Sequence, residues 1–403
     1  MPNNLPARLP VRAENEVTPV SASSTRALVP AEVSAPVPSA TAPAAASAAL
    51  VLDRKALTRA LRFASRLASR APIQALKSCL FADGYLVATD LDVSLRARIS
   101  STGYLGVLVA ADALKRCVFG SEKPDVEIRH VAPTEERPFA VSVNGAVLAG
   151  YDPREFPDPS HLFPDGEPQA QALLQSLEPL LVAATIEESR KAMNAVFFQC
   201  CKNLAIATDG HRLHALKIES GDEGDFLVPR KAIELVENIR RATRTAEVRV
   251  EFFEHQAVFH VGLFDVSVRL ETEKFPAWEE VVPKQSKYEF GVQKKALLEA
   301  LDRIAAVMNE RSRGVRLRKI AEGLEISGKK PDAAELTITI PANGWNEGDL
   351  IGVNLGYLHD AVRFAPSENV TIGITDENHP IKIADGRFLA IVMPIRLEKG
   401  EIR

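Results

Sequence analysis

The sequence contains no apolar run approaching the roughly 18 residues that a membrane-spanning helix needs. Its mean hydropathy is -0.04, and 25% of its 403 residues are charged, so an integral membrane protein is excluded. Cysteine is scarce: Cys79, Cys117, Cys200 and Cys201 form no Cys-x-x-Cys pair, and two adjacent cysteines make a poor disulfide framework. We therefore expect a reduced, cytoplasmic setting.

An excess of charge of either sign is also missing. Lys and Arg number 49 against 53 Asp and Glu, and the net charge of -4 argues against a protein coated in basic charge, although not against a basic channel inside an acidic exterior. Aromatic residues make up only 6%, so a platform for stacking single-stranded bases is not indicated. The sequence has no GxSxG, P-loop, HExxH or zinc-finger spacing, and we expect no metal or other cofactor.

Residues 1–50 lack lysine and aromatic side chains and hold eight of the 26 prolines and thirteen alanines. Such a segment cannot bury enough apolar surface to offset the entropy of ordering, so we expect a disordered tail. The alternative is an Ala/Ser/Arg-rich transit peptide. Glu14, Glu16 and Glu32, together with the dense proline, disfavour the amphipathic helix that a transit peptide requires.

The rest of the chain repeats itself at a period of 119 residues. GYLVATDLD returns as NLAIATDGH and more weakly as GLEISGKKP, which aligns Thr89, Thr208 and Ser327; REFPDP returns as EKFPAW, which aligns Phe156 with Phe275. Each copy has an amphipathic helical segment at its start and another near its middle, with short alternating segments such as 247–271 that are typical of antiparallel strands. The sequence predicts an α+β fold with three modules, over 51–165, 166–285 and 286–403.

Basic residues gather on helical faces although the chain is acidic. On a helical wheel, Leu57, Ala60, Leu61, Ala64 and Leu67 lie on one side of the first predicted helix. Lys55, Arg59, Arg62 and Arg66 lie on the other side, and the second and third copies also carry clustered arginines. A solvated face would explain one such helix, but three in an acidic chain favour a surface that faces phosphates without regard to base sequence.

The segment ATDGHRL could suggest acid–base chemistry through Asp209 and His211. However, Asp-Gly after an apolar strand is a turn signal, and the corresponding DLD at 90–92 lacks the His and Arg. We therefore interpret the segment as a turn, not as a catalytic site.

Five segments in order, ATDGHRL, FLVPRKAIEL, FPAWEEVVP, RGVRL and VMPIRL, resemble the bacterial DNA polymerase III β subunit, the β sliding clamp. The resemblance runs from about residue 51 to 397 and implies three repeated clamp modules per chain. It also implies that two subunits form a head-to-tail ring, with antiparallel sheets outside and helices lining the hole. The implied function is that of a non-catalytic processivity factor on double-stranded DNA, with the polymerase III α subunit, the clamp loader and other clamp-motif proteins as partners.

The resemblance also implies sites. DNA contacts would fall on Arg66, Arg70, Lys191, Arg230 and Lys231, and the dimer interface would use Leu148, Val307 and Met308. A pocket for a partner peptide with a leucine/phenylalanine-type anchor would lie between the second and third modules. Its residues would be Met193, Thr208, Gly210, His211, Arg212, Leu213, Pro276, Val281, Asn354, Tyr357, Ile391, Met393, Pro394, Ile395 and Arg396.

Several positions depart from the family pattern, namely Ser312, Glu280, Asn378 and Pro380 around the pocket, Ala146 at the interface, His214 after TDGHRL, and the extra residues 398–403. We expect a shifted partner preference, a weaker dimer, and partial covering of the pocket by the extra residues. The alternative function is a specialised clamp copy: a decoy, an accessory-polymerase clamp or a resistance copy.

Overall fold

The computed structural model describes residues 49–99, 107–135, 137–308, 313–330, 334–344 and 351–396. The expectations for residues 1–48, Ser312 and residues 398–403 lie outside these ranges. Within them, no helix is long and apolar enough to cross a membrane, and all four cysteines are free thiols.

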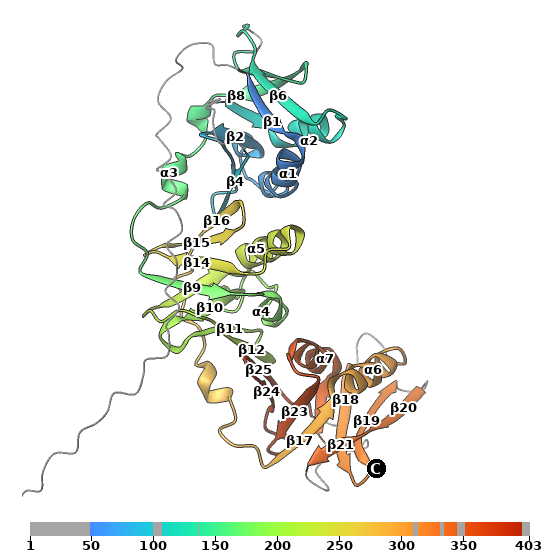
Figure 1. Ribbon diagram of the computed structural model, residues 1–403. Helices are drawn as coiled ribbons and strands as arrows, with labels where there is room; N and C mark the ends of the chain where they lie inside the picture. The colour runs from blue at the N-terminus through green and yellow to red at the C-terminus, as the bar shows by residue number, and fades with distance from the viewer. Residues whose placement is uncertain are drawn as a thin grey trace, which may run out of the picture. The chain divides into compact units, whose positions relative to one another are not determined.

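The described chain repeats one order of elements three times (Figure 1). The order is a strand, a helix and three strands, followed by the same series again. Module 1 consists of β1 (Leu50–Asp53), α1 (Arg54–Ala68), β2 (Ser78–Ala82), β3 (Tyr85–Thr89), β4 (Val93–Arg98), β5 (Val107–Ala110), α2 (Ala111–Phe119), β6 (Asp125–His130), β7 (Ala140–Val143) and β8 (Ala146–Tyr151). Module 2 consists of β9 (Ala170–Leu174), α4 (Glu178–Ala183), β10 (Ala195–Gln199), β11 (Leu204–Thr208), β12 (Arg212–Lys217), β13 (Asp225–Pro229), α5 (Arg230–Thr243), β14 (Val248–Phe252), β15 (Gln256–Val261) and β16 (Phe264–Arg269).

Module 3 follows the same order with one extra short strand. It consists of β17 (Tyr288–Gln293), α6 (Lys294–Ala305), β18 (Gly314–Ile320), β19 (Gly323–Lys330), β20 (Ala334–Ile340), the extra β21 (Ala342–Gly344), β22 (Ile351–Asn354), α7 (Leu355–Phe364), β23 (Asn369–Ile374), β24 (Ile381–Asp385) and β25 (Phe388–Val392). The short α3 (Pro159–Leu162) and a 3-10 helix over Trp278–Val281 lie in the segments that join the modules. The predicted α+β fold with three repeated modules is therefore correct.

Two antiparallel strand pairs join the modules. In seam 1–2, β4 pairs with β16, so that Ser94 lies opposite Ser267. In seam 2–3, β12 pairs with β25, so that Leu213 lies opposite Ile391. Because β12 and β25 occupy the places in modules 2 and 3 that β4 and β16 occupy in modules 1 and 2, the two seams are equivalent and can be compared residue by residue.

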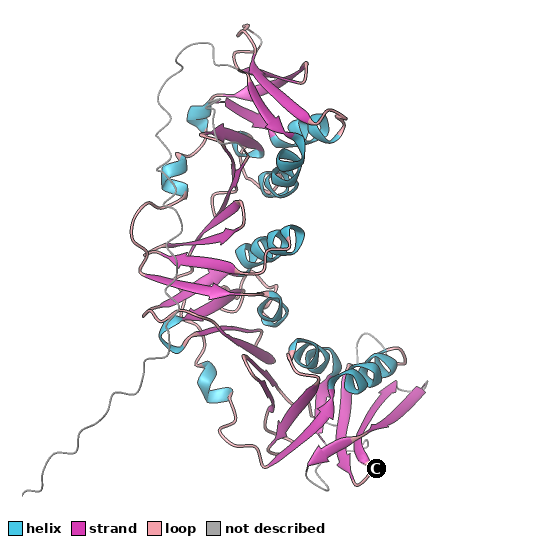
Figure 2. Cartoon of the chain, viewed as in Figure 1, coloured by secondary structure: helices cyan, strands magenta, loops and turns pink. Residues whose placement is uncertain are grey.

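The two main helices of each module pack against each other, α1 on α2, α4 on α5 and α6 on α7, on the same side of that module's sheets (Figure 2). The side chain of Asp53 caps α1 by accepting a hydrogen bond from the Ala56 N–H at 2.7 Å. The five apolar residues predicted to face the core of this helix are buried, and its four predicted basic residues are exposed.

One predicted helix is shorter than expected. The amphipathic segment at the start of the second copy, 174–184, predicts a helix over its whole length, but Leu174 ends β9 and α4 covers only Glu178–Ala183. Pro179 lies in the first turn of α4, where its missing N–H is tolerated. The stretch therefore contributes its first residue to β9 and forms only about one and a half turns of helix in α4.

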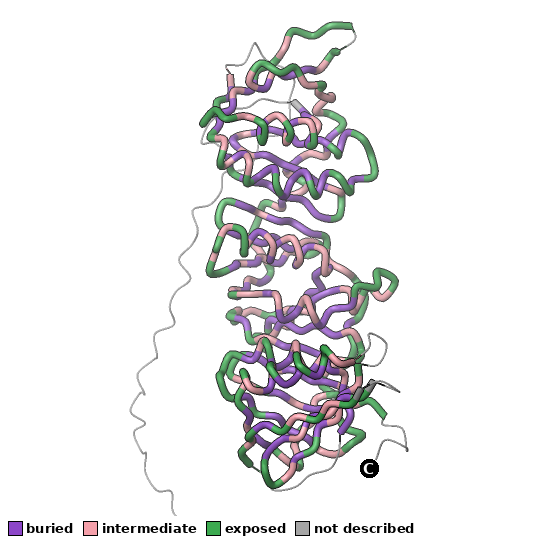
Figure 3. Tube along the Cα trace, turned by 90° about the vertical axis from the view of Figure 1, so that its right-hand side faces the viewer, coloured by how far each residue is buried: buried purple, intermediate pink, exposed green. Residues whose placement is uncertain are grey.

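Buried positions run through the strands and the inner faces of the helices (Figure 3). The aligned Phe156 and Phe275 lie in the segments that follow modules 1 and 2 and are each 6% exposed. Each belongs to a separate small apolar cluster. The repeated phenylalanine is thus an anchor that fixes a connecting segment to its sheet.

Candidate functional site

The turn between β11 and β12 is built by its own polar side chains. The Oγ1 of Thr208 donates to the carbonyl of Arg212 at 2.6 Å and accepts from the N–H of Gly210 at 3.1 Å. Asp209 Oδ1 accepts from the backbone N–H groups of His211 and Arg212 at 2.9 and 3.0 Å. Gly210 has a φ of +92°, a conformation that side chains rarely adopt. The predicted turn is confirmed, and the Asp209 carboxylate stabilises it by accepting hydrogen bonds from the backbone.

The end of β25 lies beside this turn. The N–H of Met393 donates to the carbonyl of His211 at 2.9 Å, Pro394 forms a bridge with Val353, and the Ile395 N–H donates to the Gly352 carbonyl at 2.8 Å. Met393 thus joins module 3 to the turn of module 2, while Pro394 and Ile395 are held by β22 (Ile351–Asn354) of their own module. The structure therefore assembles at one place two segments that the sequence separates widely.

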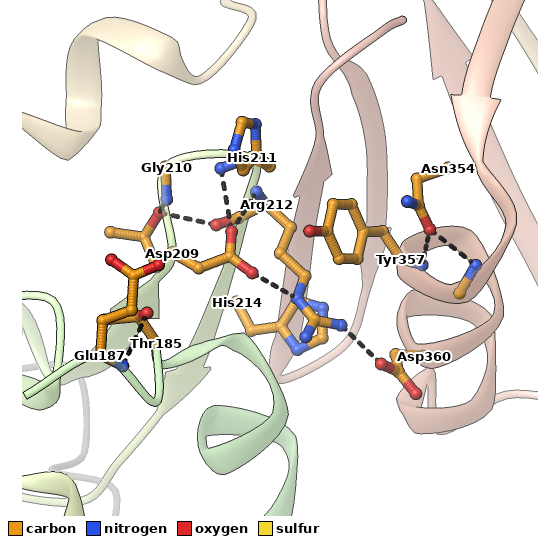
Figure 4. Close-up of polar contacts among 12 residues, drawn as sticks. Thr185, Glu187, Asp209, Gly210, His211, Arg212, His214, Asn354, Tyr357 and Asp360 are labelled. Atoms are coloured by element: carbon orange, nitrogen blue, oxygen red, sulfur yellow. Dashed lines mark hydrogen bonds and ion pairs between the residues drawn. The ribbon is translucent and has the colours of Figure 1, made fainter. Parts of the chain in front are cut away.

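Arg212 links the two modules with its side chain (Figure 4). Its Nε donates to Asp209 Oδ2 at 3.1 Å, and its Nη1 donates to Asp360 Oδ2 on α7 at 2.5 Å. The guanidinium carbon lies 4.5 Å from the centre of the Tyr357 ring, a cation–π distance. The Arg212 side chain is only 13% exposed, and its charge is paired with two carboxylates of the same chain.

Tyr357 connects this ion pair to the surface. Its ring stacks on that of His211, with centroids 6.3 Å apart and an interplanar angle of 15°. Burial, together with the charge of Asp209, raises the pKa of the Tyr357 phenol. The helix that carries Tyr357 begins at Asn354, whose Oδ1 accepts from the backbone N–H groups of Gly356 and Tyr357. Asn354 therefore caps the first turn of α7, the turn that carries the Tyr357 ring.

A small apolar cluster forms a floor on the other face of seam 2–3. Leu213 and Ile391, opposite each other across the seam, are 2% and 1% exposed. Phe275 covers them from the connecting segment and stacks on Phe197 with centroids 4.8 Å apart. Val281, 40% exposed, lies in the same connecting segment as Phe275. An apolar floor with a partly exposed apolar rim can accept an apolar side chain from another molecule.

His214 points away from this floor and is fully buried. Its Nδ1 lies 2.6 Å from the carbonyl of Pro179, its Nε2 has no hydrogen-bond partner among the described residues, and its ring packs edge-on against Phe388. Burial lowers the pKa of His214 to about 4. The imidazole is therefore neutral at neutral pH, and its role is in packing.

Most of the pocket residues expected from the resemblance lie around these two features. Met193 contacts the Arg190 guanidinium, which lies 3.2 Å from where a side chain on Gly210 would begin. Pro276 and Arg396 are exposed. Of the departures, Glu280 is exposed beside Val281, while Asn378 and Pro380 lie in the turn before β24, whose Ile381 pairs with Val392.

Two carboxylates of this site were missed by sequence reasoning as site residues, Asp209 and Asp360. Asp209 stood inside the repeated turn motif, where its backbone role was the visible one. Asp360 lies three positions after Tyr357 on α7, and this spacing places both on one face of the helix. That spacing was the only available signal, because the partner of Asp360 lies 148 residues away in the sequence.

The basic residues expected to contact DNA fall into two groups. Arg66 in the last turn of α1, Arg70 just after it and Lys231 on α5 line one cleft at the junction of modules 1 and 2. Lys231 is paired there with Asp92. Arg230 and Lys191 do not line this cleft, although Arg230 pairs with Glu234, which does. The backbone N–H of Arg230 donates to the carbonyl of Asn194, in the loop that carries the exposed Lys191.

The residues expected at a dimer interface lie at opposite ends of the repeat. Leu148 is half-buried on β8 of module 1, and Val307 and Met308 are half-buried after α6 of module 3. They do not meet within the chain. Ala146, at the start of β8, is exposed.

Comparison with known proteins gives a consistent result. Residues 279–396 match the family model described as "DNA polymerase III beta subunit, C-terminal domain". The beta sliding clamp of Pseudomonas putida is 30% identical over 258 residues, which cover 59% of this chain and 70% of that protein. The beta sliding clamp of Vibrio cholerae is 24% identical over 329 residues, or 77% of this chain and 88% of that protein. The crystal structure of a DNA polymerase sliding clamp from Pseudomonas aeruginosa has a similar fold, with a TM-score of 0.74, 23% identity, and coverage of 87% of this chain and 100% of that one.

Proposed function

The chain belongs to the beta sliding clamp family, and from this premise we propose that two copies close head to tail into a ring around duplex DNA. Its function is that of a DNA sliding clamp, a processivity factor that tethers the polymerase to DNA. The ring would consist of three modules per subunit, over 51–165, 166–285 and 286–403, after a tail over 1–50. No chemical step by the chain itself is part of the proposal, and the proposed location is the cytoplasm.

The observation that carries the ring is the pairing of sheet edges. The first three-strand series of modules 1 and 2 ends in β4 and β12, and each pairs with the last strand of the following module, β16 or β25. The corresponding strand of module 3, β20, is the edge of its sheet in the described chain. The remaining last strand, β8, pairs with β7 over Ala146–Ala149 and with β5 only at Gly150 and Tyr151, so the other side of Ala146–Ala149 has no strand partner among the described residues. Pairing β20 with β8 of a second copy would repeat the seam a third time and satisfy both edges.

Solution mass by light scattering tests this arrangement. A subunit of 43.9 kDa predicts about 88 kDa for two copies, by doubling. Val147 on β8 and Val51 on β1 are 46% and 58% exposed, which makes them a matched pair at two edges of module 1. We expect Val147→Asp to give monomers and Val51→Asp to remain dimeric. A wild-type monomer at all concentrations, or equal behaviour of the two variants, contradicts the proposal.

We place partner binding at seam 2–3. The floor of Leu213 and Ile391 and the exposed Val281 would receive an apolar anchor of a partner peptide. Thr208, Gly210, His211, Met193 and the segment from Met393 to Arg396 would surround it, with Asn354 and Tyr357 on the module 3 side. Support comes from the hydrogen bonds that assemble these segments, and the test is binding of a labelled peptide with a Leu-Phe anchor to wild type and Met393→Ala.

We place DNA contact on the helices, with α1 as its main element. Lys55, Arg59, Arg62 and Arg66 form no ion pair among the described residues, whereas arginines of α5 and α7 pair with Glu234, Glu237 and Glu178. Cations without protein partners are free to exchange counterions with phosphates. Together with Arg70, Lys191, Arg230 and Lys231, they would give a sequence-independent grip.

The alternative of a specialised clamp copy depends on the departures from the family pattern. In the described part of the chain, Glu280, Asn378 and Pro380 are compatible with either reading, and no contact of theirs favours a decoy or resistance copy. The homodimeric processivity factor therefore remains the proposal.

A further inference from the structure

Seams 1–2 and 2–3 join modules in the same way, and an ion pair crosses each of them, Arg96 with Asp265 in seam 1–2 and Arg212 with Asp360 in seam 2–3. The two pairs differ in place, because only the pair of seam 2–3 starts from the first residue of its strand. Arg212 in seam 2–3 corresponds to Val93 in seam 1–2, since each begins its strand and lies opposite Val392 or Val268. The cross-module ion pair nearest to Val93 is Lys231 with Asp92, whose side chains are 38% and 64% exposed. Joining two modules therefore does not require a buried arginine at this position.

The Arg212–Asp360 ion pair lies directly behind Tyr357, one of the residues of the proposed partner site. Asp360 is 25% exposed and holds Nη1 of Arg212, while Asp209 holds Nε. With both ends of the guanidinium fixed, its plane is set against the Tyr357 ring at 4.5 Å, and that ring in turn stacks on His211. Through Arg212, Asp360 is thus connected to the half-buried Tyr357 ring and to the exposed His211 ring that stacks on it.

Building on the proposed function, we propose that Asp360 is a positioning residue for partner binding. It holds Arg212 against Tyr357 and so couples the peptide site to the closure of seam 2–3. Asp360 acts from behind the site, through Arg212. The coupling is reciprocal, because a peptide that binds the ordered site must stabilise the seam by the same factor.

The first test is peptide affinity, measured by fluorescence anisotropy with a labelled Leu-Phe peptide. We expect Asp360→Asn to weaken binding at least about fivefold, the scale of coupling within one hydrogen-bonded network. The matched control is Arg363→Gln, which breaks a different ion pair from α7 to module 2, with Glu178 on α4, without touching Tyr357. Equal losses in the two variants would mean that any loosening of the seam suffices, and would overturn the assignment.

The second test separates positioning from general destabilisation. In a Tyr357→Leu background we expect Asp360→Asn to have no further effect on affinity, whereas additive losses would refute the coupling. In wild type, peptide should slow hydrogen exchange at the Met393 N–H, which crosses the seam to His211, and in Asp360→Asn this protection should be reduced. Unchanged protection would also refute it.

The outcomes distinguish this inference from the proposed function. If Met393→Ala weakens binding and Asp360→Asn does not, the site is correct and the positioning role is wrong. If wild type does not bind the peptide, or Met393→Ala binds as well as wild type, the proposed partner site itself is wrong, and the role of Asp360 is rejected with it.

Discussion

Replacing the buried His214 should remove part of the acid sensitivity of the protein. The ring is fully buried between β12, α4 and β25, with its Nδ1 against the Pro179 carbonyl. Leu95 occupies the corresponding position of seam 1–2 and is also fully buried. His214→Leu is therefore a substitution for which the chain itself supplies the precedent.

The magnitude follows from the pKa. Burial, the largest influence, lowers the pKa of His214 from 6.5 to about 4 in the folded protein. As the pH falls below 6.5 the unfolded chain takes up a proton that the folded chain does not, so the free energy of unfolding decreases until the folded pKa is reached. A difference of about 2.5 pH units, at about 1.4 kcal/mol each, corresponds to about 3–4 kcal/mol.

Urea unfolding at pH 7.0 and 4.5, at fixed protein concentration, measures this loss. We expect wild type to lose about 2–3 kcal/mol more than His214→Leu between the two pH values. His255, which is exposed, provides the control His255→Gln, which should follow wild type. If His214→Leu and wild type lose equal stability, His214 is not held neutral in the folded protein and the reasoning fails.

Three further predictions concern other parts of the chain. Burial acts to lower the pKa of His260, but hydrogen bonds and charges from Asp265 and Glu251 outweigh it and raise the pKa. Its stabilisation should therefore be lost as the pH rises above 6.5 through the folded pKa, and His260→Gln should flatten urea midpoints measured between pH 6 and 9. Arg62→Ala should weaken binding to short duplexes of different sequence equally and reduce the slope of log K against log salt by about 1; an unchanged slope would remove Arg62 from the DNA surface. Leu213→Ser, which copies Ser94 of the other seam, should abolish Leu-Phe peptide binding without altering solution mass, and retained affinity would show that Leu213 is core packing alone.

The repeated elements could be predicted because they depend on local sequence. Helical periodicity and the 119-residue repeat gave all six main helices, and Asp-Gly gave the turn after β11. The predicted length of α4 was wrong, because the apolar stretch 174–184 is compatible with a strand and with a helix. The pairing of β9 with β14 decides where the strand ends and the helix can begin. Ser327 aligned with the ends of β3 and β11 but lies in the middle of β19, which continues to Lys330.

The site was predictable only where local chemistry determines it. The turn residues Thr208 to Arg212 hydrogen-bond to one another, so their arrangement is encoded in five consecutive positions. The destination of the Arg212 side chain is not, because Asp360 reaches it through the pairing of two modules. The family resemblance placed Arg212 in the partner pocket, and no pattern within either module indicates that two carboxylates already bind its guanidinium.

The two seams share one architecture but differ in the chemistry of their facing residues, which is why the proposed partner site lies at only one of them. At seam 1–2 the facing residues Ser94 and Ser267 are buried, and Ser94 hydrogen-bonds Thr89 at 2.9 Å. Polar groups that are satisfied in this way gain nothing from an apolar visitor. At seam 2–3 the same positions are the apolar Leu213 and Ile391, which are also buried. They pack in one cluster with the partly exposed Trp278 and Val282, whose apolar surface an incoming side chain would extend. An apolar cluster would give a partner affinity but fix its orientation poorly, and in the proposed site the charges of Arg212 and its two carboxylates would supply that constraint. The fold thus provides the same junction twice, and the side chains at a few facing positions are what distinguish the two.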